Sequence, residues 1–306
     1  MERDFLSIDD LTPGELDRIL DLAAKVKATP EDYADRLHRK AIALIFEKPS
    51  TRTRVSFEVA IAGTGGHPVA LSTAELQLGR GETIEDTGRV LSRYVDAIVL
   101  RTFEQERLEQ LAAAASVPVV NALSDFEHPC QALADLLTVR EARGGPGGRV
   151  LVYLGDGNNV THSLLLAGAK VAMHVRVATP PGFEPIPQVV HRAREIAQET
   201  GGSVEVLNDA AAACRGADVL YTDVWASMGQ EDEAEERALV FPAYQLNQAL
   251  VELAKDDVTI LHCLPAHRGQ EITDEVIDGP RSAVWEQAEN RLHTQKAVLL
   301  WLLGLE

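Results

Sequence analysis

Short apolar runs without alternating polar positions recur along the chain, separated by segments in which apolar residues have helical spacing. Such runs are typical of parallel strands that are buried on both faces. The pattern therefore predicts an α/β fold built on parallel sheets flanked by helices. The predicted strands are residues 42–46, 97–100, 117–120, 150–154, 175–178, 204–207, 219–221 and 258–261.

The first helix is predicted from its N-terminal signals. Thr12 and Glu15 have the spacing of a capping box, and Pro13 stands at the first helical position. Apolar residues follow at helical spacing from Leu16 onward. A further helix is expected over residues 131–140.

A glycine-rich segment over residues 143–148 interrupts the strand and helix series about halfway along the chain and cannot continue a helix. The length of 306 residues is about twice that of a common domain. We therefore expect two domains, residues 1–142 and 149–286, each with its own parallel sheet.

Acidic residues dominate the charge: 47 Asp and Glu oppose 29 Lys and Arg, which gives a net charge of −18. A general nucleic-acid or membrane-surface binder is disfavoured because both need a basic face. No apolar run approaches the roughly 18 residues of a membrane span, and the acidic start is unlike a signal peptide. A cytoplasmic protein with three free cysteines is the expectation.

Polar clusters follow nearly every predicted strand, where open parallel sheets bind their ligands. The first, Ser50-Thr51-Arg52-Thr53-Arg54, stands where a strand leads into a helix. Free amides at a helix start, two kinds of hydroxyl and a guanidinium suit a phosphate dianion. The alternative is an N-cap followed by two surface arginines.

Two further clusters allow more than one interpretation. His128 and Gln131 share one helix face and could donate hydrogen bonds to a carbonyl oxygen, or could serve only packing and capping. The segment 155–159 (Gly-Asp-Gly-Asn-Asn) lacks the third glycine of a dinucleotide fingerprint, since Val160 stands there. Its asparagines form either a polar clamp or a plain turn.

The second half carries Asp223 ahead of Ser227-Met228-Gly229, and His262-Cys263-Leu264-Pro265. A carboxylate at a strand end suits a cationic amino group, and a thiol paired with Asp223 could serve proton transfer or polar recognition. The remaining cysteines are dispersed and no compact four-ligand pattern appears, so neither zinc nor another metal is expected.

Together these segments resemble the aspartate and ornithine carbamoyltransferase family over nearly the whole chain. Residues 50–54 are similar to its carbamoyl-phosphate signature, and His128-Pro129-Cys130-Gln131 is similar to its second signature. Asp223, the Ser-Met-Gly segment and His-Cys-Leu-Pro resemble the ornithine branch. The aspartate branch would carry an arginine-bearing His-Pro-Leu-Pro-Arg segment, where Cys263 and Ala266 stand here.

The resemblance implies an enzyme that transfers the carbamoyl group of carbamoyl phosphate to the δ-amino group of L-ornithine, giving L-citrulline and phosphate in arginine metabolism, without cofactor. It also implies a last helix, residues 287–306, that returns to the N-terminal domain. The carbamoyl-phosphate site would comprise Ser50, Thr51, Arg52, Thr53, Gln77, Arg101, His128, Gln131 and Arg291, with Arg52, Arg101, His128 and Cys263 catalytic.

For ornithine, the resemblance implies a site in the second domain, together with a homotrimer, or a multiple of trimers, in which the Gln77 loop reaches the neighbouring subunit's site. The lysine of some relatives is replaced by Gly81 in that loop. The expected ornithine site comprises Asn159, Asp223, Ser227, Met228, Cys263 and Leu264.

Three alternatives remain at this stage. The acceptor could be putrescine or an acylated ornithine, although putrescine lacks the amino-acid end that Asp223 and Ser-Met-Gly would recognise. The chain could be a non-catalytic, ligand-binding relative. A nucleotide-dependent oxidoreductase is disfavoured because the glycine fingerprint is incomplete.

Overall fold

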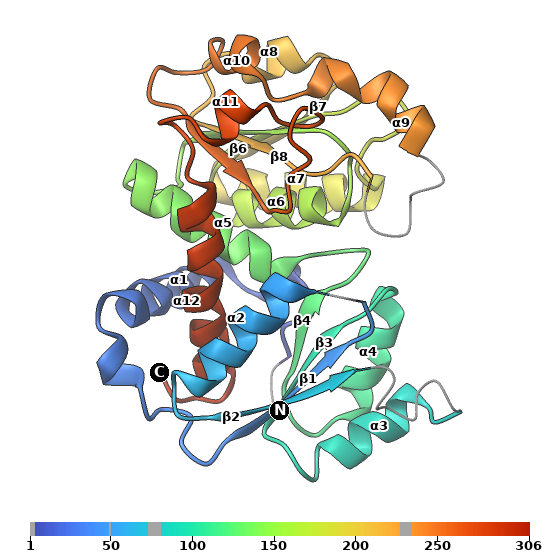
Figure 1. Cartoon of the computed structure of the whole chain (residues 1–306), viewed down its shortest axis with the longest axis vertical. Coiled ribbons are helices and arrows are strands. Elements are labelled where there is room, and N and C mark those ends of the chain that lie inside the picture. Colours follow the sequence, from blue (N-terminus) through green and yellow to red (C-terminus); the bar gives the residue numbers. More distant parts are fainter. Residues whose placement is uncertain (1–3, 49, 73–80, 227–233) are drawn as a thin grey trace. The chain divides into compact units, whose positions relative to one another are not determined.

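Two parallel sheets carry the predicted strands, so the predicted α/β class is confirmed (Figure 1). The computed structural model describes residues 4–48, 50–72, 81–226 and 234–306. Contacts divide the chain into unit 1, Met1–Ala134 with Arg291–Glu306, and unit 2, Asp135–Asn290.

Unit 1 contains a four-stranded sheet in which all pairs are parallel and the strand order is β2-β1-β3-β4. Buried aliphatic side chains such as Ile45, Ile98 and Leu111 form part of its core. The strands are β1 (Ala41–Phe46), β2 (His67–Ser72), β3 (Ala97–Arg101) and β4 (Val119–Leu123). Its helices are α1 (Pro13–Ala28), α2 (Thr51–Ala62), α3 (Ile84–Leu91) and α4 (Gln105–Ala114), with 3₁₀ turns η1 (Ile8–Asp10) and η2 (Pro30–Tyr33).

The strand β2 is absent from the sequence-based prediction. It lies at the edge of the sheet, none of its side chains is fully buried, and Pro68 stands within it. Proline is tolerated at a sheet edge because the missing N–H faces no neighbouring strand. An edge strand therefore lacks the continuous apolar run that marks the central strands.

Unit 2 contains a five-stranded parallel sheet in the order β7-β6-β5-β8-β9. Tyr153 and Tyr221 are fully buried on neighbouring strands. The strands are β5 (Val150–Leu154), β6 (His174–Ala178), β7 (Ser203–Leu207), β8 (Val219–Thr222) and β9 (Thr259–His262). The helices are α6 (Asn159–Lys170), α7 (Pro187–Thr200), α8 (Ala210–Cys214), α9 (Ala234–Val240), α10 (Gln248–Val251) and α11 (Asp274–Ile277), with the 3₁₀ turn η5 (Phe241–Tyr244).

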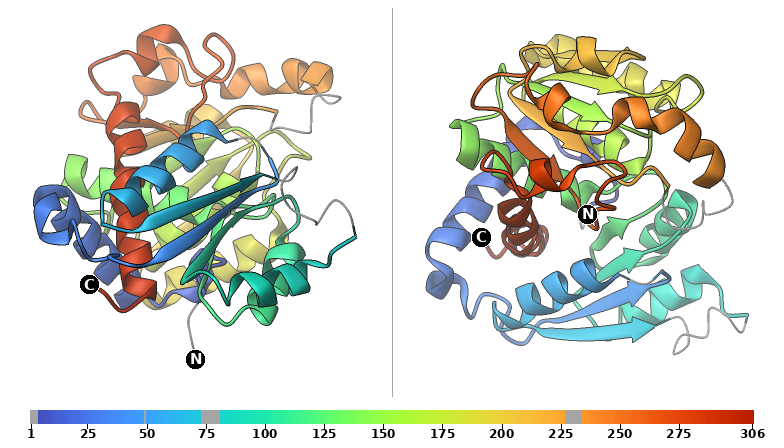
Figure 2. Two further views of the ribbon diagram at one scale, coloured as in Figure 1. Left: turned by 60° about the horizontal axis from the view of Figure 1, so that its bottom comes forward. Right: turned by 45° about the horizontal axis from the view of Figure 1, so that its top comes forward.

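Two long helices contain the divisions between the units: α5 (Pro129–Arg143) between Ala134 and Asp135, and α12 (Val284–Leu302) between Asn290 and Arg291. From Arg291 onward, α12 belongs to unit 1 and runs alongside α2 (Figures 1 and 2). The return of the last helix to the first domain is thus confirmed. The predicted boundary at residues 142–149 stays a prediction.

Asp218 secures both ends of the glycine-rich segment 143–148. This buried carboxylate contacts Arg143 at 3.4 Å, Arg149 at 3.3 Å and Lys255 at 2.8 Å, and it accepts a hydrogen bond from the Val150 amide at 2.9 Å. The segment is therefore held within unit 2 by ion pairs and hydrogen bonds centred on one buried carboxylate.

Each described sheet has a topological switch point, the place between two neighbouring strands from which the strand order runs outward in both directions. In unit 1 it lies between the neighbouring strands β1 and β3, and in unit 2 between β5 and β8. Ligands of open parallel sheets bind beyond the carboxyl ends of the strands at such points. Among the described residues, no helix is long and apolar enough to cross a membrane.

Candidate functional site

The N-terminus of α2 lies at the switch point of unit 1, directly after β1. Ser50 precedes the helix, but its hydroxyl makes no capping hydrogen bond. Thr51 and Arg52 are exposed, whereas Thr53 is buried. The first amides of a helix have no intrahelical acceptor, so this segment offers N–H groups, hydroxyls and a guanidinium to an anion. Arg54 instead pairs with Glu58 at 2.8 Å along the helix surface.

Three arginines, Arg52, Arg101 and Arg291, form what we call the arginine cluster. Arg101 ends β3 and is in register with Phe46 at the end of β1. Arg291, on α12, is buried and donates a hydrogen bond to the Thr53 hydroxyl at 2.5 Å. These three residues are therefore brought together from β3, α2 and the last helix.

Burial lowers the pKa of Arg101 to about 10, and the positive charges of Arg291 and Arg52 contribute to that decrease. Asp125 opposes it only as the smallest of these effects. Within the part of the chain that the structure describes, the buried Nε of Arg101 has no hydrogen-bond partner. The cluster still carries its charge at neutral pH, so it is suited to bind a multiply charged anion.

His128 is buried just before α5 in the same unit. Burial lowers its pKa well below the ordinary value, and the charges of Arg291 and Arg101 lower it further. The imidazole is therefore neutral at pH 7 and can donate one N–H to a carbonyl oxygen. Gln131 is buried in the first turn of α5, where its main-chain N–H donates a hydrogen bond to the His128 carbonyl oxygen at 3.0 Å.

Glu127 anchors the segment that ends in His128. Its buried carboxylate accepts hydrogen bonds from the Ser7 hydroxyl at 2.5 Å and the Ile8 amide at 3.1 Å. The N-terminal turn η1 thus holds the residue next to His128. The sequence contained no signal for this contact, because the partners lie 120 positions apart.

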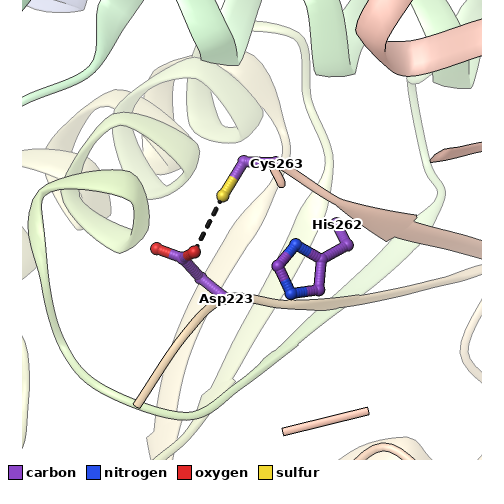
Figure 3. A group of neighbouring side chains, drawn as sticks. All are labelled: Asp223, His262 and Cys263. Carbon is purple, nitrogen blue, oxygen red and sulfur yellow. Dashed lines mark hydrogen bonds between the residues drawn. The ribbon is translucent and has the colours of Figure 1, made fainter. Parts of the chain in front are cut away.

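At the switch point of unit 2, Asp223 receives hydrogen bonds from two neighbouring strand ends. The Asn158 side-chain amide, which follows β5, donates to it at 3.0 Å, and the Cys263 thiol, which follows β9, donates at 2.9 Å. The thiol and the carboxylate point toward each other in Figure 3. We call Asn158, Asp223 and Cys263 the Asp223 cluster.

Burial raises the pKa of Cys263 well above its ordinary value, and the charge of Asp223 raises it further. The sulfur is therefore a thiol at neutral pH rather than a thiolate. A protonated thiol donates a hydrogen bond and cannot take a proton from a substrate amine. Of the two roles considered for Cys263, the geometry favours polar recognition.

His262 supports the turn that contains Leu264. Its Nδ1 accepts a hydrogen bond from the Leu264 amide at 2.9 Å, and its Nε2 lies 3.0 Å from Glu271. Leu264 has a φ of 58°, so the His262 contact holds it in the left-handed region. Ligand atoms of Asp223, His262 and Cys263 lie within 4.8 Å of one another, and the spacing of these residues along the sequence does not reveal that Asp223 joins the pair. Both His262 nitrogens are already engaged within the chain.

Gly157 explains why segment 155–159 resembles a dinucleotide fingerprint. A Cβ atom at this position would lie 2.2 Å from the Pro185 nitrogen and 2.6 Å from the Phe183 carbonyl oxygen. The chain's own backbone therefore occupies the space that a pyrophosphate would need above the second glycine. This glycine serves internal packing, which argues against the oxidoreductase alternative.

Comparison with known protein families gives a match for each half of the chain. The family model described as the aspartate/ornithine carbamoyltransferase carbamoyl-P binding domain matches residues 3–141, and the corresponding Asp/Orn binding domain matches residues 147–302. The chain belongs to the aspartate/ornithine carbamoyltransferase family.

Relatives within this family are similar over their full length. An ornithine carbamoyltransferase of Parafrankia sp. is 61% identical over 98% of this chain and 96% of the relative. The solved ornithine carbamoyltransferase of Pyrococcus furiosus is 55% identical with a TM-score of 0.96, covering 99% of this chain and 97% of that one. A structure from Thermus thermophilus is 46% identical with a TM-score of 0.89, covering 98% of both chains.

In this carbamoyltransferase chain, the structure places the predicted residues in two groups. Unit 1 contains the arginine cluster with Ser50, Thr51, Thr53, His128 and Gln131, and unit 2 contains Asn159, Asp223, Cys263 and Leu264. Gln77, Ser227 and Met228 lie outside the described residues. Asn159 accepts a hydrogen bond from the Val160 amide at 2.9 Å in the first turn of α6. Asn158, and not the predicted Asn159, donates a hydrogen bond to Asp223; the tandem asparagines are the sequence signal for this contact.

Proposed function

We propose that this chain catalyses transfer of the carbamoyl group from carbamoyl phosphate to the δ-amino group of L-ornithine. The observation that carries the proposal is the arginine cluster at the switch point of unit 1, three positive charges beside a helix N-terminus. Full-length similarity to ornithine carbamoyltransferases supports the acceptor. One relative, from Pyrococcus furiosus, is named as anabolic.

Carbamoyl phosphate is proposed to bind in unit 1. Its phosphate would receive hydrogen bonds from Ser50, Thr51, Thr53 and the first amides of α2, with Arg52 and Arg291 supplying charge. The carbonyl oxygen would lie against Arg101, His128 and Gln131. A neutral His128 suits this role, because it adds an N–H donor without a further positive charge beside the arginines.

Ornithine is proposed to bind in unit 2. The Asp223 carboxylate would receive the α-ammonium group, and Asn159 would contribute to recognition of the amino-acid end. Cys263 and the main chain of Leu264 would contact the side-chain amine. The thiol's hydrogen bond to Asp223 supports this assignment, since it fixes the carboxylate for a cationic partner.

The proposed reaction requires the neutral δ-amine. Its lone pair forms the new C–N bond, the carbonyl oxygen gains negative charge, and the C–O bond to phosphate then breaks. Arg101 and His128 would stabilise the oxygen, while Arg52 would stabilise the departing phosphate, which takes up the electrons of the broken bond. The proton lost by the amine goes to phosphate or solvent. One C–N bond forms and one C–O bond breaks at the same carbon, so no oxidation state changes and the proposed transfer includes no redox step.

An acceptor panel tests the proposal. Purified chain is incubated with carbamoyl phosphate and ornithine, putrescine, acetylornithine or aspartate, and phosphate release is followed. Efficient release with ornithine alone is expected, because only ornithine combines a free amino-acid end with a terminal amine. Preference for putrescine would contradict the assignment of Asp223, and release with none of them would indicate a non-catalytic binder.

We infer that the chain assembles as a homotrimer or as a multiple of trimers. Family membership supports the assembly, and exposed Val55 and Val59 support a subunit contact on the first turns of α2, directly after residues 50–54. These side chains lie one turn apart on α2 and are 51% and 48% exposed. A native mass of three chains, or a multiple of three, is expected, and a stable monomer would contradict the inference.

A further inference from the structure

Arg237 of α9 is a buried cation that the proposed reaction does not use. Its side chain is 5% exposed and forms an ion pair with Asp156 at 2.8 Å. It also donates a hydrogen bond to the Trp225 carbonyl oxygen at 2.6 Å. The rings of Phe183 and Phe241 lie 4.9 and 5.7 Å from its guanidinium carbon, so the group is surrounded on several sides.

The two partners of Arg237 belong to the segments that carry the Asp223 cluster. Asp156 follows β5, and its carbonyl oxygen accepts hydrogen bonds from the Asn158 amide and the Thr161 hydroxyl, both at 2.8 Å. Trp225 stands two residues after Asp223 in the segment that follows β8. Arg237 thereby links the strand ends whose side chains meet in the Asn158–Asp223 hydrogen bond.

Burying a charged pair costs desolvation energy that its mutual attraction offsets only with good geometry, so well-packed apolar residues can be as stable. The Asp156–Arg237 pair is therefore better explained by a need for fixed geometry than by stability. We propose that Arg237 is a positioning residue for the amino-acid end of ornithine, acting through Asp156 and Trp225. This inference rests on the proposed function, because it names the support of the proposed ornithine site.

Arg237→Met tests the inference by removing the charge and the donors while retaining apolar bulk. Displacement of about 1 Å can lower the rate roughly 10²-fold, so we expect kcat/KM for ornithine to fall about 10- to 100-fold, with a raised KM for ornithine because the displaced groups bind its amino-acid end. The KM for carbamoyl phosphate should stay within about twofold, since its proposed residues lie in unit 1. Arg237→Lys should recover part of the loss by restoring charge without the planar fork.

Asp156→Asn provides a second variant that removes only the partner charge. It should raise the same KM, and the double variant should be no worse than Arg237→Met alone if both residues act through one ion pair. Arg176→Met is the matched control, because Arg176 also donates to main-chain carbonyls of unit 2, those of Ala213 and Arg215. It should lower the melting temperature without changing the KM for ornithine.

Three outcomes would overturn the inference. They are an unchanged ornithine KM in folded Arg237→Met or Asp156→Asn, an equal rise in both substrates' KM values, or the same ornithine defect in Arg176→Met. If Arg237→Met does not fold, the KM values of Asp156→Asn for ornithine and carbamoyl phosphate test the inference in its place. Absence of citrulline formation by the wild-type chain would instead refute the proposed function, so the two failures are distinguishable.

Discussion

Replacing Arg52 by glutamine should separate catalysis from stability. Arg52 is exposed on the first turn of α2, so its loss should change the free energy of unfolding by no more than about 0.5 kcal/mol. A charge about 4 Å from a phosphate oxygen contributes roughly 4 kcal/mol at an effective dielectric constant of about 20. Each 1.36 kcal/mol corresponds to about a tenfold change in rate, so kcat/KM for carbamoyl phosphate should fall by about 10³-fold.

Arg54→Gln is the matched control on the same helix. Arg54 pairs with Glu58 and has the surface role that the alternative interpretation gave to both arginines. Citrulline formation and urea unfolding are measured for both variants. A fall of less than tenfold in Arg52→Gln, or equal losses in both variants, would refute the phosphate assignment.

Further predictions concern Cys263, Asp218 and His128. Cys263→Ser should retain the hydrogen-bond donor to Asp223 and keep activity within about tenfold of the wild type. Cys263→Ala removes the donor and should raise the KM for ornithine more than Cys263→Ser does. A pH–rate profile with a thiolate step between pH 7 and 9 would contradict the raised pKa of Cys263. Burial raises the pKa of Asp218, but hydrogen bonds from Lys255 and the Val150 amide outweigh it and hold the pKa below its ordinary value. The unfolded state therefore binds this proton more readily, so the stabilisation is present above about pH 4 and is lost as the pH falls through the folded pKa. Asp218→Ala should lower stability at pH 7 by about 1–3 kcal/mol and flatten the acid decline, because its partners Arg149 and Lys255 remain partly solvated and Arg143 keeps Asp257. Unchanged urea curves at both pH values would count against the network. ¹⁵N NMR should find His128 neutral from pH 8 to below pH 6.5, because burial, with the charges of Arg291 and Arg101, lowers its pKa. Protonation near its ordinary pKa would contradict both effects.

Central strands and site segments could be predicted from sequence because both depend on short-range patterns. Continuous apolar runs identify strands buried on both faces, and polar residues directly after them lie at the carboxyl edge. This reasoning located Arg52, Arg101 and Asp223 correctly at the two switch points. It missed β2, an edge strand in which Pro68 and partial burial weaken the apolar pattern.

Residues that support the site through long-range contacts could not be predicted in this way. Glu127 is fixed by Ser7, and Arg237 is fixed by Asp156 and Trp225, from parts of the chain that no local pattern connects. The protonation states also depend on tertiary structure. Burial and neighbouring charge keep His128 neutral and Cys263 protonated, and neither effect is visible in residue spacing.

The acidic composition describes the chain as a whole and conceals the charge at the site. A net charge of −18 disfavours general polyanion binding, yet three arginines gather beside the N-terminus of α2. The arginine cluster therefore has more influence on anion binding than the net charge does. Its charges act over a few ångströms, whereas salt screens the more distant acidic surface charges.

The central claim is tested most directly by measuring citrulline and phosphate together. Purified chain receives carbamoyl phosphate and ornithine, and both products are quantified over time beside Arg52→Gln. The proposed reaction predicts one citrulline for each phosphate above the spontaneous decay of carbamoyl phosphate, with both products reduced in parallel in the variant. Phosphate release without citrulline, or citrulline formation that does not depend on Arg52, would contradict it.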